Sequence, residues 1–225
     1  MKKIRVWDLP LRLFHWTLAA LLVAAWVTQY IGGNAMDWHF RIGYAVLVLI
    51  LFRIVWGFIG PRYARFSSFL YGPSAIAGYL RGHPSQRPGH NPLGSLSVFA
   101  LIGVVFAQAL SGMFTNDDIF FTEGPLARYI SKDLSDWLTW FHRDVSVVAL
   151  YVMVALHLAA IAWYVVVKRK RLIRPMFTGD QEVEEPMPGI EAARDDWKTR
   201  LLAVTILGGL AALMIWIVTL PRTYL

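Results

Sequence analysis

The most informative segment of the sequence is FHRDVSVVALYVMVALHLAA, residues Phe141–Ala160. This apolar segment has about the length of a helix that crosses a bilayer core, yet it carries two histidines, His142 and His157. In an α-helix their spacing places the two imidazoles only about 60° apart around the axis and about 22 Å apart along it. One helix would therefore present two imidazoles to the same neighbouring region at two depths.

The composition indicates a polytopic membrane protein. Of 225 residues, 56% are hydrophobic and only 16% are charged. The chain has no cysteine, which excludes disulfides, thiolate-bound iron–sulfur clusters and thioether-attached haem. The net charge is +7, but the basic residues lie mostly in short loops between apolar runs. We attribute them to membrane orientation and expect no nucleic-acid partner.

Five segments have the length and apolarity of membrane spans, and in lipid we expect them to be helices because their backbones must satisfy their own hydrogen bonds. We interpret the first as a retained helix rather than a signal peptide, since no small-residue cleavage site follows it. The polar connection Gly179–Lys198 is expected to be a loop, with a short surface helix from Ile190. The spans run from about Leu11–Ile31, His39–Ile59, Leu96–Phe114, Trp137–Val167 and Thr199–Leu220.

Lysine and arginine are distributed unequally between the two sides of these spans. Of the loop and terminal basic residues, 15 fall on the side of the N-terminus and only 4 on the other side. The bias predicts a cytoplasmic N-terminus and an outer, periplasmic C-terminus. The acidic stretch Asn116–Gly124 would then face outward. The loop Asn116–Asp136, with five acidic residues against Arg128 and Lys132, can steer a basic redox protein there, or else is only a solvated cap.

Four histidines form two pairs at matched depths when the chain is threaded through the bilayer. His39 and His142 lie toward the outer face, and His15 and His157 lie deeper toward the inner face. Facing helices commonly build cofactor sites in this way, and imidazole is the expected axial ligand of b-type haem in a cysteine-free protein. The pattern predicts an outer and an inner haem b. The alternatives are interhelical hydrogen bonds or another metal site.

Five further residues are candidates for the haem surroundings. Gly43 lies one turn beyond the outer histidine of the second span and can clear space for a ring, or else serve close helix packing. Arg53, deep in the second span, is expected to bind a haem propionate or a quinone carbonyl, or to extend to the interface. Arg12 is expected to turn to an inner propionate or to the interface, and Pro10 beside it is awkward for a continuous helix. Arg41 and Arg143 are candidates for outer propionates, or else ordinary interface anchors.

The remaining two histidines, His83 and His90, lie between the second and third spans. Both are expected to be ordinary surface or loop histidines.

Four motifs together resemble the bacterial cytochrome b561 superfamily, which includes the b-type cytochrome subunits of nickel–iron hydrogenases. The motifs are RVWDLPLRLFHW, HFRIGYAVLVLILFRIVWGFIGPRYARF, GHNPLG and FHRDVSVVALYVMVALH. The resemblance implies an all-α membrane protein, a four-helix transmembrane bundle holding two b haems. Its ligand positions fall on the four paired histidines. In this chain a fifth, C-terminal transmembrane helix follows. The expected division is 1–179 for the dihaem bundle, 180–198 for a cytoplasmic loop and 199–225 for the additional helix.

The resemblance further implies an electron-transfer subunit of the bacterial cytoplasmic membrane. It would pass electrons between a quinone pool and a periplasmic or membrane-bound redox protein, either a hydrogenase-like subunit or a cytochrome c. An alternative is a stand-alone quinone-linked oxidoreductase that acts on a small oxidant or reductant, such as superoxide, at the outer haem. A second alternative is a redox-inactive membrane anchor.

Overall fold

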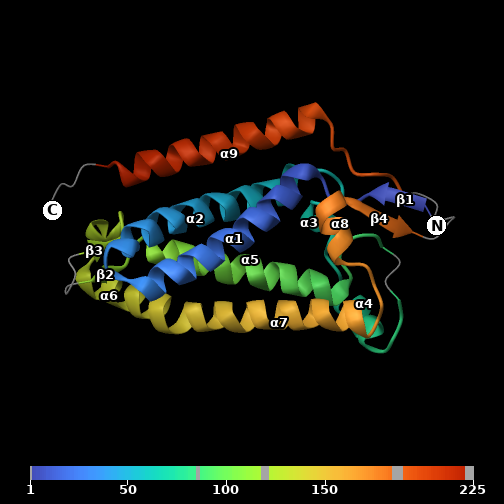
Figure 1. Cartoon of the computed structure of the whole chain (residues 1–225), viewed down its shortest axis with the longest axis horizontal. Helices are drawn as coiled ribbons and strands as arrows, with labels where there is room; N and C mark the ends of the chain where they lie inside the picture. Colours follow the sequence, from blue (N-terminus) through green and yellow to red (C-terminus); the bar gives the residue numbers. More distant parts are fainter. Residues whose placement is uncertain (1, 85–86, 118–121, 184–189, 221–225) are drawn as a thin grey trace. The chain divides into compact units, whose positions relative to one another are not determined.

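The computed structural model describes residues 2–84, 87–117, 122–183 and 190–220. Within these residues, five helical segments are long and apolar enough to cross a membrane (Figure 1). The all-α membrane fold expected from the sequence is confirmed. The spans are α1 (Leu9–Ile31), α2 (Met36–Ile59) with a preceding 3₁₀ turn (Gly33–Ala35), α5 (Pro92–Gly112), Lys132–Val166, and α9 (Trp197–Val218).

Helix α1 begins at Leu9, so Pro10 lies in its first turn. A proline there removes no intrahelical hydrogen bond, because the first N–H groups of a helix have no partner within it. The Asp8 side chain caps the helix, since its Oδ1 accepts a hydrogen bond from the Leu11 N–H at 3.0 Å. The concern that Pro10 breaks the helix is therefore wrong.

The fourth span is not a uniform α-helix. It consists of α6 (Lys132–Trp140), a π-helix (Phe141–Ser146) and α7 (Val147–Val166). A π-helix turns less per residue than an α-helix, so the angle of about 60° calculated from α-helical spacing does not apply across His142. π-Helical turns occur frequently at functional sites, and this one carries a candidate ligand.

Short elements connect the spans. Strand β1 (Lys2–Arg5) pairs antiparallel with β4 (Asp180–Val183), and β2 (Asn116–Asp117) pairs with β3 (Thr122–Glu123). The other short helices are α3 (Phe66–Phe69), α4 (Pro73–Leu80), α8 (Ile173–Thr178) and the 3₁₀ turn Ala127–Tyr129.

The surface helix expected from Ile190 is absent, and residues 190–195 are irregular. The Ala193 N–H donates to the Arg5 carbonyl at 2.7 Å, which holds this segment along the N-terminus instead.

The chain divides into two compact units. The first comprises Met1–His15, Arg53–Ala100 and Ala155–Val204, and the second comprises Trp16–Phe52, Leu101–Val154 and Thr205–Leu225. In each unit many large apolar side chains of the spans remain exposed, as expected for helices that face lipid. The buried core of the first unit includes Val6, Trp7, Trp56, Tyr63 and Phe69, and that of the second includes Val46, Ile50, Val105, Met113 and Leu150.

Asp195 joins several segments of the first unit. Its carboxylate accepts from Arg5 Nη1 at 2.5 Å, from Arg200 Nε at 3.2 Å and from the Leu9 N–H at 3.2 Å. Arg5 Nε also donates to Asp180 Oδ1 at 2.7 Å. These contacts hold β1, β4 and the beginnings of α1 and α9 together.

Candidate functional site

The second unit brings His39 and His142 together. Their ring centroids are 6.4 Å apart and their planes are nearly perpendicular, at 86°. His39 Nδ1 lies 2.9 Å from the Ala25 carbonyl oxygen, and His142 Nδ1 lies 2.8 Å from the Gln108 carbonyl oxygen. A carbonyl can only accept, so each Nδ1 carries the proton and each Nε2 has the lone pair that a metal requires.

Residues of α5 and of the π-helix surround His142. Gln108 Nε2 lies 3.2 Å from His142 Nε2, and the Ser146 hydroxyl donates to Gln108 Oε1. A Cβ added to Gly112 would lie 2.9 Å from His142 Cε1, so only glycine lets the ring come this close. The sequence reasoning missed these three residues. A glutamine inside an otherwise apolar span is the signal that points to them, because polar residues at membrane depth are costly.

The first unit brings His15 and His157 together. Their ring centroids are 6.5 Å apart, with an interplanar angle of 55°, and both side chains are half-buried. The structure therefore unites each of the two pairs expected from depth matching.

Both pairs fit the two axial ligands of one iron. With a metal–nitrogen bond of about 2.0–2.1 Å and a ring nitrogen about 1 Å from its centroid, two imidazoles on opposite sides of one metal have centroids about 6 Å apart. Among the described residues no group of three or more His, Asp or Glu side chains gathers to hold a bare metal ion. Two imidazoles alone suit a macrocycle that supplies the remaining ligands itself.

The surroundings of Gly43, one turn beyond His39 in α2, are open. A Cβ added there meets nothing within 4 Å, so close helix packing does not explain this glycine.

One alternative for Arg53 was that its side chain extends to an aqueous interface, and this alternative is wrong. It is 2% exposed, its guanidinium lies 4.8 Å from the centroid of the Phe66 ring, and its Nη1 is buried without a hydrogen-bond partner. Arg12 is engaged by protein groups. It donates to the Phe177 carbonyl and lies 3.9 Å from the carboxylate of Asp195.

The candidate arginines of the second unit are more exposed. The Arg41 guanidinium lies 5.2 Å from the ring centroid of Trp38. The Arg143 side chain is 66% exposed, and its Nη1 lies 4.0 Å from Asp117 Oδ2.

The two remaining histidines differ. His83 is an exposed loop residue, as expected, and its Nδ1 bonds to the Gly78 carbonyl. His90 also lies in a loop, but the surface interpretation is wrong for it. Its ring packs against Trp7 and Phe69 with centroids 4.7 and 4.6 Å apart, and its Nδ1 is shielded from solvent.

Apolar spans that carry paired imidazoles define a multi-pass membrane protein of the cytochrome b class. The sequence model of the family described as "Prokaryotic cytochrome b561" matches residues 6–179, and the chain belongs to this family. It is accordingly a membrane cytochrome with b-type haem that serves electron transfer.

Relatives with curated names extend over most of the chain. The "Probable Ni/Fe-hydrogenase B-type cytochrome subunit" of Azotobacter chroococcum mcd 1 is 31% identical, and the match covers 82% of this chain and 91% of the relative. The protein of the same name from Azotobacter vinelandii is 30% identical over the same shares. An Escherichia coli K12 relative, "Probable Ni/Fe-hydrogenase 1 B-type cytochrome subunit", is 27% identical over 42% of this chain and 52% of its own length. No solved structure matches significantly.

Proposed function

We propose that the chain is a dihaem cytochrome b that carries electrons across the cytoplasmic membrane between a quinone pool and a redox partner on the periplasmic side. The observation that carries the proposal is the equal separation of the two histidine pairs, 6.4 Å and 6.5 Å between ring centroids. Each separation suits one six-coordinate iron, and two such sites are needed to move an electron across a bilayer in steps.

The four paired histidines are the proposed axial ligands, His39 with His142 and His15 with His157. Haem b, when bound, supplies a one-electron iron couple. The protein orients the outer ligands through the two Nδ1–H···O=C hydrogen bonds, which hold each Nε2 toward the metal and increase its basicity. Because two imidazoles of the chain would hold each iron, the site would favour electron transfer over substrate chemistry at the metal.

The same proposal assigns roles to neighbouring residues. Gly43 makes room for the outer ring, and Arg41 and Arg143 bind its propionates from the exposed side. Arg53 binds an oxygen ligand near the inner haem, and Arg12 helps to compensate the negative charge of the inner haem's propionates. Support for Arg53 comes from its buried, unpartnered Nη1, because an arginine inside a membrane protein is normally paired.

Orientation and organisation follow from the charge distribution. The N-terminus is proposed to be cytoplasmic and the C-terminus periplasmic, in the bacterial inner membrane. We propose residues 1–179 as the dihaem bundle, 180–198 as a cytoplasmic connection and 199–225 as an additional helix for packing or docking. Strand β4 lies in that connection and pairs with the N-terminal strand β1. This pairing joins the beginning of the bundle segment to the residues that follow its end.

A hydrogenase-type protein is the proposed partner, because relatives named as hydrogenase cytochrome subunits match most of the chain. A periplasmic cytochrome c is the other candidate. The acidic loop is the proposed docking surface, although much of its charge is already paired: Glu123 with Arg128, and Asp117 with Arg143. Asp118, also expected in this surface, lies outside the described residues.

A haem count on ligand variants tests the proposal. The purified chain is expected to hold two non-covalent haems b. His142→Ala should remove the outer haem and spare the inner one, and His157→Ala should do the reverse. His83→Ala is the matched control, since that histidine is an exposed loop residue. One haem or none in the unsubstituted chain, or two unchanged low-spin spectra in a ligand variant, contradicts the assignment.

The exposed Arg143 beside His142 favours a second candidate function, a stand-alone oxidoreductase for a small anion such as superoxide. Co-purification distinguishes the two. A subunit retains its redox partner through mild solubilisation, whereas a stand-alone enzyme reacts with the small oxidant at full rate without one. A chain that binds no haem is neither, and would be a redox-inactive anchor.

A further inference from the structure

A run of basic residues follows the last turn of α7 in the first unit. Helix α7 ends at Val166, and Lys168–Arg171 is an uninterrupted sequence of four positive charges, with Arg174 three residues further on. All five basic side chains are exposed. Among the described residues, only Arg171 has a carboxylate nearby, that of Glu182 at 3.5 Å. The described part of this unit therefore presents four positive charges without a partner carboxylate, directly beside a membrane-spanning helix.

Most of these residues line one open pocket of about 310 Å³. Its wall combines the basic residues Arg169–Arg171 and Arg174 with the apolar residues Val165, Leu172 and Ile173. Leu172 and Ile173 are large apolar side chains that remain exposed to the surroundings of the chain. A wall of both kinds suits a ligand with a negatively charged group and a hydrocarbon part, as basic pockets beside membrane helices do for anionic lipids.

The backbone of this segment brings the charges together at a conformational cost. Arg169 has a φ of 52°, and it is the one non-glycine residue with a positive φ in the part of the chain that the structure describes. The chain turns back here, since the Lys170 N–H donates to the Tyr164 carbonyl at 2.9 Å and the Leu172 N–H donates to the Lys170 carbonyl at 3.0 Å. Glycine is the usual residue at such a position after a helix. An arginine in its place points to a use for the guanidinium itself.

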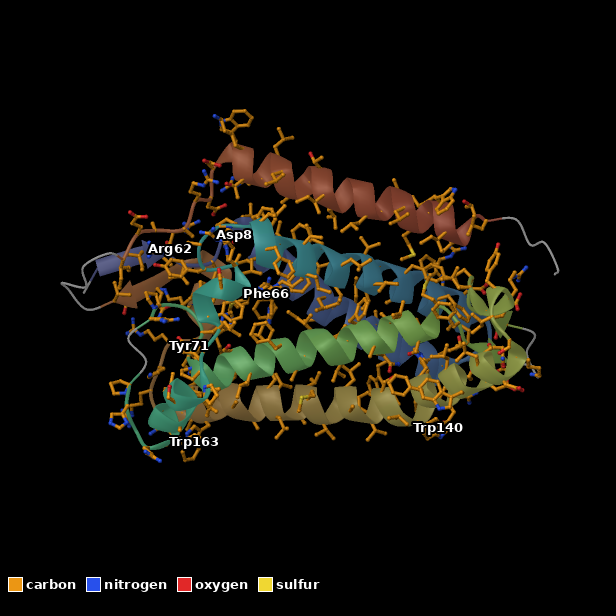
Figure 2. The ribbon with its side chains drawn as sticks, turned by 180° about the vertical axis from the view of Figure 1, so that it is seen from behind. Asp8, Arg62, Phe66, Tyr71, Trp140 and Trp163 are labelled. Carbon is orange, nitrogen blue, oxygen red and sulfur yellow. The ribbon has the colours of Figure 1, made fainter. Side chains whose placement is uncertain are left out.

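Aromatic side chains beside the pocket indicate its level relative to the membrane. Trp163, labelled in Figure 2, is exposed near the end of α7. Lys170 Nζ lies 5.9 Å from the centroid of the Tyr164 ring, and the Tyr164 hydroxyl forms a 2.7 Å hydrogen bond with the Tyr79 hydroxyl. Tryptophan and tyrosine concentrate where the hydrocarbon core meets the lipid headgroups. The pocket therefore lies at the level of the lipid phosphates.

We infer that this pocket binds the headgroup of an anionic phospholipid, with Arg169 and Arg174 donating to the phosphodiester oxygens and Leu172 and Ile173 contacting the hydrocarbon part. The guanidinium fork matches the geometry of a phosphate, and arginine always carries its charge. A free phosphate is the less suitable occupant, because it would leave the apolar half of the wall uncovered. The inference goes beyond the proposed function and stands whether or not the chain holds two haems.

The test adds lipids to the full, haem-loaded chain in a neutral detergent and counts the bound molecules by native mass spectrometry. Dioleoyl phosphatidylglycerol supplies an anionic phosphodiester, and dioleoyl phosphatidylcholine has the same acyl chains without a net charge. The first phosphatidylglycerol molecule is expected to bind about tenfold more tightly than the first phosphatidylcholine molecule. Inorganic phosphate in large excess is the third probe, and it should not displace the bound lipid.

Two double variants each remove two positive charges from the first unit. In Arg169→Gly/Arg174→Gln both charges come from the pocket, and phosphatidylglycerol should bind about 30-fold more weakly. In Arg65→Gln/Arg81→Gln they come from exposed positions outside the pocket, and binding should stay within about threefold of the unsubstituted chain. Arg169→Gly should not lower the thermal unfolding midpoint, because glycine adopts the left-handed backbone without a clash. A loss of binding is then not a loss of the fold.

Three results would overturn the inference. The first is equal binding of phosphatidylglycerol and phosphatidylcholine. The second is an equal loss of binding in the two double variants, which would assign the effect to overall surface charge. The third is displacement of the lipid by inorganic phosphate, which would make the pocket a site for a free anion. If the pocket variant does not fold, Arg174→Gln alone decides: about fivefold weaker binding supports the inference and unchanged binding overturns it.

Discussion

Gly112→Ala offers a direct test of how the outer histidine is positioned. A methyl group at this position would lie 2.9 Å from His142 Cε1 and 3.3 Å from its Nδ1. Carbon atoms pack best at about 3.5–4.0 Å, so the ring has to retreat by about 0.6–1 Å. The hydrogen bond from His142 to the Gln108 carbonyl, 2.8 Å long, would then exceed the normal range.

The displacement is large for a metal ligand, because metal–nitrogen distances are held to within about 0.2 Å. Overpacking of this size costs about 1–3 kcal/mol, which corresponds to about 5- to 150-fold weaker binding of the outer haem. We expect the purified Gly112→Ala variant to hold about one haem per chain, with the inner spectrum unchanged.

Gly208→Ala is the control, since a Cβ there meets nothing within 4 Å in a helix without histidines. Haem per chain and the reduced-minus-oxidised spectrum are measured for both variants. Two haems with an unaltered low-spin spectrum in Gly112→Ala would show that this glycine does not set the position of His142.

Three further outcomes are expected. Asp195→Asn removes the negative charge that faces Arg5, Arg12 and Arg200, and it should lower the thermal unfolding midpoint by about 2–12 °C, from about 1–3 kcal/mol of charged hydrogen bonds. Burial raises the pKa of Asp195, but its hydrogen bonds outweigh burial and lower the pKa overall. Asp195 therefore stabilises the fold above the pKa that it has in the unfolded chain, and this stabilisation is lost as the pH falls through the lower pKa of the folded state. An unfolding midpoint that does not decrease on acidification to about pH 3 would contradict this. Gly57→Ala would place a methyl group well inside the contact distance of the Phe66 ring, and we expect the free energy of unfolding to fall by about 1–3 kcal/mol, measured by thermal unfolding. Neutralising Asp117 and Glu123 together should slow electron transfer to a basic partner at low salt and flatten its salt dependence, and an unchanged rate and slope would count against this loop as the docking surface.

The sequence alone determined the features that depend on local composition. Apolar runs of about 20 residues are sufficient to place membrane helices, because in lipid the backbone N–H and C=O groups must form their hydrogen bonds within each segment. Helical spacing and direction were also enough to pair His39 with His142 and His15 with His157, since the depth of a residue in a span follows from its distance along the chain.

Tertiary structure decided what surrounds those histidines. That Gln108, Gly112 and Ser146 gather on one imidazole depends on the packing of two helices and on a π-helical turn, neither of which leaves a periodic signal in the sequence. From the sequence, His90 was expected to be an ordinary surface or loop histidine. Its packing could not be predicted, because it depends on the remote side chains that cover the loop, here Trp7 and Phe69.

The pairing of β1 with β4 was hidden for the same reason. The two strands are four residues each and about 175 residues apart along the chain, so nothing local to either one indicates its partner. Asp8 combines both kinds of information. It stands before a proline-containing first turn, where a helix cap is common, although this cap was not predicted from the sequence. Its burial and its hydrogen bond to Trp56 depend on how α2 packs against the beginning of α1, which no local pattern indicates.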